Sequence, residues 1–115
     1  MWICDTTGFF SIVKKDCNDD ELLVRARVFD DLKRLGEKLT APATAIIETP
    51  MADYRYSMTA KASAIAEYHA SSALAIDYEN FKASLPHKTL MDVKRARAYA
   101  YVWSALYQLQ PKEGK

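Results

Sequence analysis

The chain has 115 residues, of which 50% are hydrophobic and 27% are charged, and its 16 Lys plus Arg against 15 Asp plus Glu leave a formal net charge of +1. This length predicts one globular domain spanning residues 1–115, because a second domain would have too few residues for a core of its own. The near-neutral charge excludes a global electrostatic attraction to nucleic acid or to an anionic membrane, so any such attraction must come from local patches.

Two β-rich runs at residues 2–4 and 9–13 predict a hairpin, because Asp-Thr-Thr-Gly between them ends on Gly8, which tolerates a positive φ. A third strand is predicted at residues 22–28. There, apolar residues alternate with Arg25 and Arg27, so the two arginines share the face opposite the apolar one.

A short helix follows, because Leu32, Leu35 and Leu39 recur at helical spacing and either Asp30 or Asp31 can cap its start.

A second hairpin is predicted from strands at residues 45–49 and 54–58, joined by a turn that begins at a proline. In its second strand the alternation places Tyr54 and Met58 on the apolar face and Arg55 on the other.

From residue 59 onward the sequence is rich in alanine and predicts helices at residues 60–76 and 90–109, with a short turn at 78–82 capped by Asp77. The final helix is expected to bury a stripe of Val93, Ala96, Tyr99, Ala100, Trp103, Leu106 and Tyr107. The order ββ-β-α-ββ-α-α therefore predicts an α+β fold, an antiparallel sheet of about five strands with helices packed on one face.

Several landmarks in the sequence resemble those of another group of proteins. They are Trp2, Gly8-Phe9-Phe10-Ser11, Val24-Arg25-Ala26-Arg27, Glu48-Thr49-Pro50, Asp53-Tyr54-Arg55-Tyr56, Ile76-Asp77-Tyr78-Glu79-Asn80-Phe81-Lys82, Ala98-Tyr99 and Val102-Trp103. On these residues the chain resembles a family of small uncharacterised bacterial proteins over nearly its full length. The resemblance implies one domain; the family has no established activity, so it implies no catalytic or binding residue.

Residues able to hold a metal or perform catalysis are few and scattered. Cys4 and Cys17 lack nearby ligand partners and are expected to be reduced thiols, with a bridge between them as the alternative. His69 and His87 are expected to be packed and solvated respectively. The sequence thus predicts no catalytic residue, no metal site and no cofactor.

No run approaches the roughly 20 apolar residues that span a bilayer. The first residues, Met-Trp-Ile-Cys-Asp, meet an acid before any apolar run, unlike a secretory leader. We therefore expect a cytoplasmic protein without a membrane partner.

The most informative feature is the set Arg25, Arg27 and Arg55, each predicted opposite the apolar side of its strand. If the two strands that carry these arginines lie in the same sheet, the three guanidinium groups gather on its helix-free face, with Lys14 and the ring of Phe10 beside them. Guanidinium groups bind phosphate and carboxylate bidentately.

The alternative is that Asp5 and Glu48 neutralise these arginines across strands, each exposed pair contributing only about 0–1 kcal/mol. A second candidate surface is Lys94, Arg97 and Tyr101 on the solvent side of the final helix, where Arg97 and Tyr101 are spaced for a cation–π contact.

Together these features predict a small non-enzymatic interaction protein that binds a protein or protein complex. One specific form of this hypothesis is a phage-encoded inhibitor of a bacterial defence complex, similar to anti-CRISPR proteins. The alternative is a nucleotide or RNA-binding module that uses the arginine-bearing sheet face. An unrecognised enzyme is the third hypothesis.

Overall fold

The computed structural model describes residues 1–111. By its internal contacts the chain divides into two units, a sheet unit of Met1–Asp77 and a helical unit that begins at Tyr78. A single domain over residues 1–115 stays a prediction.

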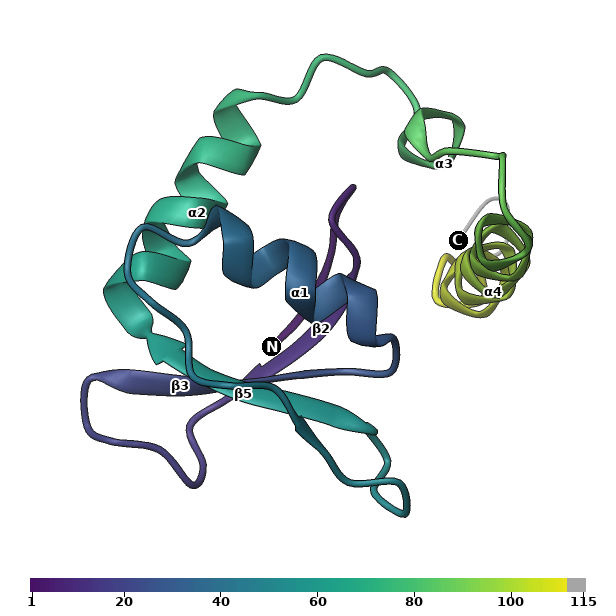
Figure 1. Cartoon of the computed structure of the whole chain (residues 1–115). Helices are drawn as coiled ribbons and strands as arrows, with labels where there is room; N and C mark the ends of the chain where they lie inside the picture. Colours follow the sequence, from purple (N-terminus) through teal and green to yellow (C-terminus); the bar gives the residue numbers. More distant parts are fainter. Residues whose placement is uncertain (112–115) are drawn as a thin grey trace. The chain divides into compact units, whose positions relative to one another are not determined.

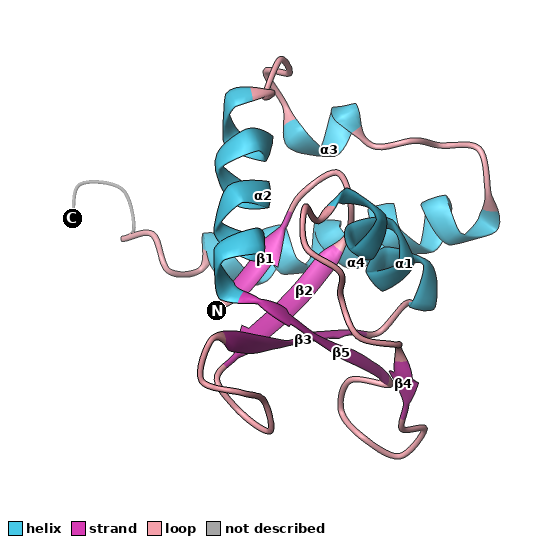
Figure 2. Cartoon of the chain, turned by 60° about the vertical axis from the view of Figure 1, so that its left-hand side comes forward, coloured by secondary structure: helices cyan, strands magenta, loops and turns pink. Residues whose placement is uncertain are grey.

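The sheet unit is built on an antiparallel sheet, shown in Figures 1 and 2. Within residues 1–111 this sheet has five strands in the order β1-β2-β3-β5-β4, and all neighbouring pairs are antiparallel. The strands are β1 Trp2–Cys4, β2 Phe9–Val13, β3 Glu21–Ala26, β4 Ile47–Glu48 and β5 Tyr56–Lys61. The predicted α+β class and antiparallel sheet are confirmed.

Helices α1 (Phe29–Lys38) and α2 (Ala62–Leu74) lie on the same side of this sheet (Figures 1 and 2). Their apolar residues meet alternate residues of the strands, as the period-2 pattern requires. The core consists of Phe10, Ile12, Val24, Ala26, Leu32, Leu35, Met58, Ala60, Ile65 and Tyr68.

The start of α1 differs from the prediction. Its N-cap residue is Val28, which makes no side-chain capping bond, so neither Asp30 nor Asp31 caps the helix. Asp31 lies within the first turn and is 1% exposed. There it pairs with Arg34 at 2.7 Å and accepts a hydrogen bond from the Phe9 amide at 3.3 Å. The carboxylate therefore binds the first hairpin to α1.

The last strand lies further along the chain than expected, because β5 runs to Lys61 instead of ending at residue 58. Its pairing with β3 continues to the Glu21–Lys61 pair, and the Thr59 amide also donates to Thr44 Oγ1 at 2.8 Å. This ladder overrides the helix propensity of the alanine-rich sequence at its end. The helix expected from residue 60 therefore begins at Ala62.

The helical unit contains α3 (Phe81–Ser84) and α4 (Leu90–Tyr107). Asn80 caps α3 by accepting from the Ala83 amide at 3.0 Å, so the cap is not Asp77 as predicted. The rings of Phe81 and Tyr99 stack with centroids 6.1 Å apart and join the two helices.

Thr89 and Asp92 form a capping box at the start of α4, where each side chain accepts from the other residue's amide. In α4, whose residues are all described, none is buried by the rest of the helical unit, so the apolar stripe expected on this helix has no cover within that unit. None of the helices in residues 1–111 has the length and apolar character needed to cross a membrane.

Gly8 provides a test of how the hairpin and α1 fit together. A Cβ atom at Gly8 would lie under 3.0 Å from the side chain of buried Asp31, so Gly8→Ala must displace the carboxylate from its hydrogen bonds. We expect a loss of about 1–3 kcal/mol in the free energy of unfolding, measured by urea denaturation.

Gly36→Ala is the matched control. The nearest atom to its added Cβ, Met58 Sδ, is 4.0 Å away, and the position is helical. This substitution should stabilise the protein by about 0.4–1 kcal/mol. Equal effects of both substitutions would contradict the proposed close contact.

Candidate functional site

The face of the sheet turned away from α1 and α2 carries a continuous row of side chains. Directly paired residues of antiparallel strands project to the same side of a sheet. One such row runs from edge to edge through Trp2, Ser11, Arg25, Ser57 and Ile47. Its flanking neighbours in β3, Val24 and Ala26, are fully buried on the helix side. We call the side that bears this row the open face.

Both ends of the row are apolar and exposed. Trp2 on β1 is 72% exposed and Ile47 on β4 is 60% exposed. The Trp2 ring packs against Phe9 of β2 with centroids 5.9 Å apart. Both edges of the open face therefore offer apolar surface to another molecule.

Arg25 occupies the middle of the row and is partly buried. Its Nη2 donates to the hydroxyl of Ser11 at 2.8 Å, and its Nε is buried without a hydrogen-bond partner among the described residues. The guanidinium carbon lies 4.8 Å from the centre of the Tyr54 ring, and that of Arg27 lies 4.1 Å from the same centre. Such cation–π contacts contribute about 0.5–2 kcal/mol each.

These three residues, Arg25, Arg27 and Tyr54, form what we call the arginine–tyrosine site. Neither arginine is within ion-pair distance of a carboxylate in residues 1–111. The site therefore carries two positive charges without a carboxylate partner in the described chain.

Arg55 does not join the other two arginines. It forms an ion pair with Glu48 at 2.6 Å, and the hydrogen bond between these side chains raises the pKa of Arg55 above its usual value. For this arginine the alternative of neutralisation by Glu48 is correct.

Asp5 does not neutralise the arginines either. Its Oδ1 accepts from the amides of Thr7 and Gly8 at 2.8 and 3.2 Å, and its Oδ2 accepts from the Tyr68 hydroxyl at 2.6 Å. The Asp5 carboxylate thus accepts hydrogen bonds from the first hairpin turn and from Tyr68 of α2, and not from the arginines.

Two other residues expected on the open face are elsewhere. Phe10 is fully buried in the core, because its partner in β1 is Ile3 on the helix side. The Lys14 ammonium donates to the carbonyl groups of Asn18, Asp19 and Glu21 at 2.7, 2.7 and 2.9 Å, and so binds the β2–β3 loop.

Tyr54 does not lie on the face predicted for it. Alternation placed it with Met58 on the apolar face, but Tyr54 precedes β5 and the period of 2 does not extend beyond the paired residues. Its ring instead contacts the two arginines. A tyrosine beside alternating arginines on a neighbouring strand is the signal that could have indicated this contact.

The second predicted surface lies on α4. Lys94, Arg97 and Tyr101 are all exposed, with Tyr101 at 71%. The expected cation–π contact between Arg97 and Tyr101 is not formed in the described structure. Arg95 and Tyr99 make such a contact instead, at 5.7 Å. A role of this surface in partner binding stays a prediction.

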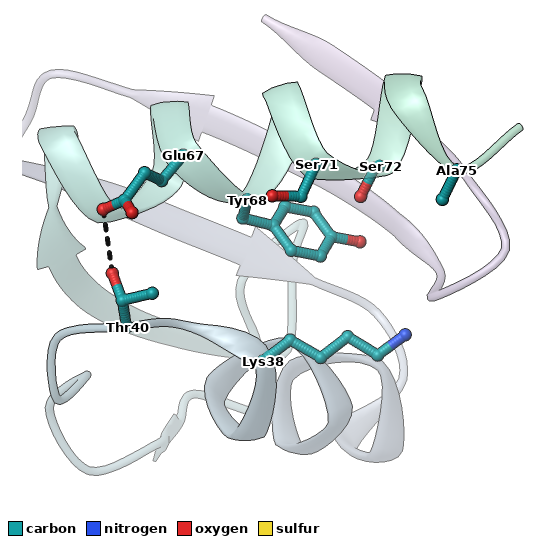
Figure 3. Close-up of a pocket in the computed structure, with 7 residues that line it drawn as sticks. All are labelled: Lys38, Thr40, Glu67, Tyr68, Ser71, Ser72 and Ala75. Carbon is teal, nitrogen blue, oxygen red and sulfur yellow. Dashed lines mark hydrogen bonds between the residues drawn. The ribbon is translucent and has the colours of Figure 1, made fainter.

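A pocket of about 270 Å³ lies elsewhere in the sheet unit, between the end of α1 and α2 (Figure 3). Its lining consists of Lys38, Thr40, Glu67, Tyr68, Ser71, Ser72 and Ala75. Thr40 donates to Glu67 at 3.1 Å at one end of the pocket, and the Lys38 ammonium donates to Thr7 at 3.2 Å. Both charged groups therefore already have partners within the protein.

Tyr68 is 7% exposed and connects this pocket to the first hairpin. Its hydroxyl lies 2.6 Å from Asp5 Oδ2 and 2.7 Å from Thr7 Oγ1. Burial, followed by the hydrogen bond to Asp5, raises the pKa of the Tyr68 hydroxyl above its usual value of 10. The neutral phenol is thus a structural bridge between the β1–β2 turn and α2.

In residues 1–111, neither His69 nor His87 forms a hydrogen bond with Ser57 or Cys17, the nucleophile types that a catalytic histidine would activate. Ser57 lies in the open-face row, whereas His69 lies on α2 with its ring 5.2 Å from that of Tyr68. Cys4 and Cys17 are not joined by a disulfide. In residues 1–111, no group of three His, Cys, Asp or Glu side chains could hold a metal ion. The absence of catalytic activity stays a prediction.

Comparisons with known proteins give no relative for this chain: no family model, no curated protein and no solved structure matches it.

The Tyr68 bridge gives a prediction about stability and pH. Tyr68→Phe should lower the free energy of unfolding by about 1–3 kcal/mol at pH 7, because Asp5 and Thr7 lose a buried partner. Since the folded state binds the phenolic proton more tightly than the unfolded state, this stabilisation is complete below pH 10 and declines as pH rises further.

Denaturation of both proteins from pH 7 to pH 11 measures this difference. A difference that grows above pH 10 would show that the hydroxyl is not held in its neutral form.

Proposed function

We propose that this protein is a non-enzymatic interaction protein that binds a protein partner through the open face. The observation that carries the proposal is the row across the sheet, in which exposed Trp2 and Ile47 flank Arg25. Tryptophan, tyrosine and arginine are the residue types that dominate the energetics of protein interfaces.

The dimensions of the face suit a protein surface better than a small ligand. Strands spaced by about 4.8 Å place the two ends of the row roughly 19 Å apart. Exposed apolar residues at both ends require a ligand of at least that width to cover them. A partner protein with a complementary flat surface fulfils this requirement.

The alternative of RNA or nucleotide binding ranks second. It is favoured by the exposed Trp2 ring, on which a base could stack, together with the guanidinium groups of Arg25 and Arg27. A nucleic-acid site, however, normally gathers several cations along a phosphate chain. Arg55 is already paired with Glu48, and Lys61 with Asp20, so few charges remain for that role.

A cytoplasmic location is part of the proposal. It rests on the expectation from the sequence that the two cysteines are reduced thiols, as in a reducing compartment. Inhibition of a bacterial defence complex is one form that the proposed interaction could take, and it stays a prediction.

Variants at the ends of the row test the proposal. The partner is first identified by affinity capture from the native host and then purified. Trp2→Ala and Ile47→Ala should each weaken its binding tenfold or more in titration calorimetry, because each removes exposed apolar contact area.

Tyr101→Ala on α4 is the control, since Tyr101 is equally exposed but lies outside the open face. If Tyr101→Ala alone abolishes binding, the docking surface is α4 and the proposal is wrong. Tight oligonucleotide binding that falls steeply with salt would support the second function instead.

A further inference from the structure

We infer that the arginine–tyrosine site binds a carboxylate, and that this carboxylate is an Asp or Glu side chain of the protein partner. The inference rests on the proposed function, because it names the chemistry by which the open face recognises its partner. Three observations carry it: the charge of the site, the donors that it leaves available and the apolar surface on either side.

The charge of the site has no counterpart in the described chain. Arg25 and Arg27 share one aromatic ring, yet no carboxylate of residues 1–111 lies within ion-pair distance of either. The acids expected to neutralise them are used elsewhere, Glu48 by Arg55 and Asp5 by the first hairpin turn and Tyr68. An external anion would provide the missing charge.

The donors are arranged for a carboxylate to bind. Arg25 Nη2 donates a hydrogen bond to the hydroxyl of Ser11, which is 2% exposed. This bond to a buried residue fixes the position of the guanidinium group. Its Nη1 makes no hydrogen bond within the described chain. Arg27 is exposed and makes none, so its planar fork can bind a carboxylate bidentately. Tyr54 holds both groups in place before binding, which lowers the side-chain entropy lost on association.

The surroundings favour an acidic protein segment over a phosphate chain. Along the row, the neighbours of Arg25 are Ser11 and Ser57, and beyond them lie Trp2 and Ile47. A polyanion crossing this face would meet apolar surface at both ends. An acidic side chain flanked by apolar residues matches the row in both charge and polarity.

Two probes of the free protein test the ligand chemistry. Hexaglutamate and hexauridylate are titrated at low salt while the side-chain NMR signals of Arg25 and Arg27 are followed. Hexaglutamate should shift both signals saturably, and Arg27→Gln should weaken its binding fivefold or more. Arg27→Lys should restore less than half of the loss, because lysine keeps the charge without the fork.

Arg55→Gln is the matched control and should leave hexaglutamate binding unchanged, because Arg55 is already paired with Glu48. The inference is wrong if hexaglutamate shifts neither signal, if Arg27→Gln binds it as the wild type does, or if hexauridylate binds more tightly. Circular dichroism verifies that each variant is folded.

The purified partner separates this inference from the proposed function. If Trp2→Ala weakens partner binding and Arg27→Gln does not, the open face is the docking surface but no partner carboxylate uses the site. If neither variant has an effect, the proposed function itself fails. If both weaken binding tenfold, and an Asp or Glu substitution in the partner removes the effect of Arg27→Gln, both proposals are supported.

Discussion

The register between β3 and β5 is the constraint on which the rest of the sheet unit depends. It pairs Val24 with Met58 on the helix side and Arg25 with Ser57 on the open face. Because side chains alternate with a period of exactly two residues, a shift of one residue would place the arginine in the core and expose the valine. The hydrophobic core and the candidate binding surface are therefore products of one pairing.

The polar groups beneath α1 and α2 complement this apolar core. Asp31 accepts from the Phe9 amide and Arg34, while Tyr68 reaches Asp5 and Thr7. Both helices thus contact the same short turn through buried, hydrogen-bonded polar side chains. Such groups impose directional requirements that apolar packing lacks, so they specify where each helix lies on the sheet.

The parts of the fold predicted correctly from sequence are those in which a local period determines burial. In β3, the alternation of Val24 and Ala26 with Arg25 is present in the residues themselves, so the two faces could be assigned before the structure was known. The predictions that failed depend on distant residues. Asp31 resembles a helix cap locally, yet it is buried because the first hairpin turn places amides and Gly8 against it.

The candidate site was predictable only in part for the same reason. Arg25 and Arg27 were correctly placed on one face by their own strand, but the loop before β5 determines where Tyr54 and Arg55 lie. No periodicity in that loop indicates that one residue contacts the arginines and that the other pairs with Glu48. The Arg55–Glu48 pair lies beside the last pair of the β4–β5 ladder, Glu48–Tyr56, whereas Tyr54 meets the arginines just beyond the Ala26–Tyr56 pair that ends the β3–β5 ladder.

The close approach of Gly8 to Asp31 has an evolutionary consequence. A larger residue at position 8 would fit only if position 31 became smaller, but a smaller residue there would deprive the Phe9 amide and Arg34 of their acceptor. Because a change at either position alone costs stability, substitutions at positions 8 and 31 are coupled. In diverged descendants of this chain, the two residues should be retained together or replaced together, along with the arginine one helical turn later.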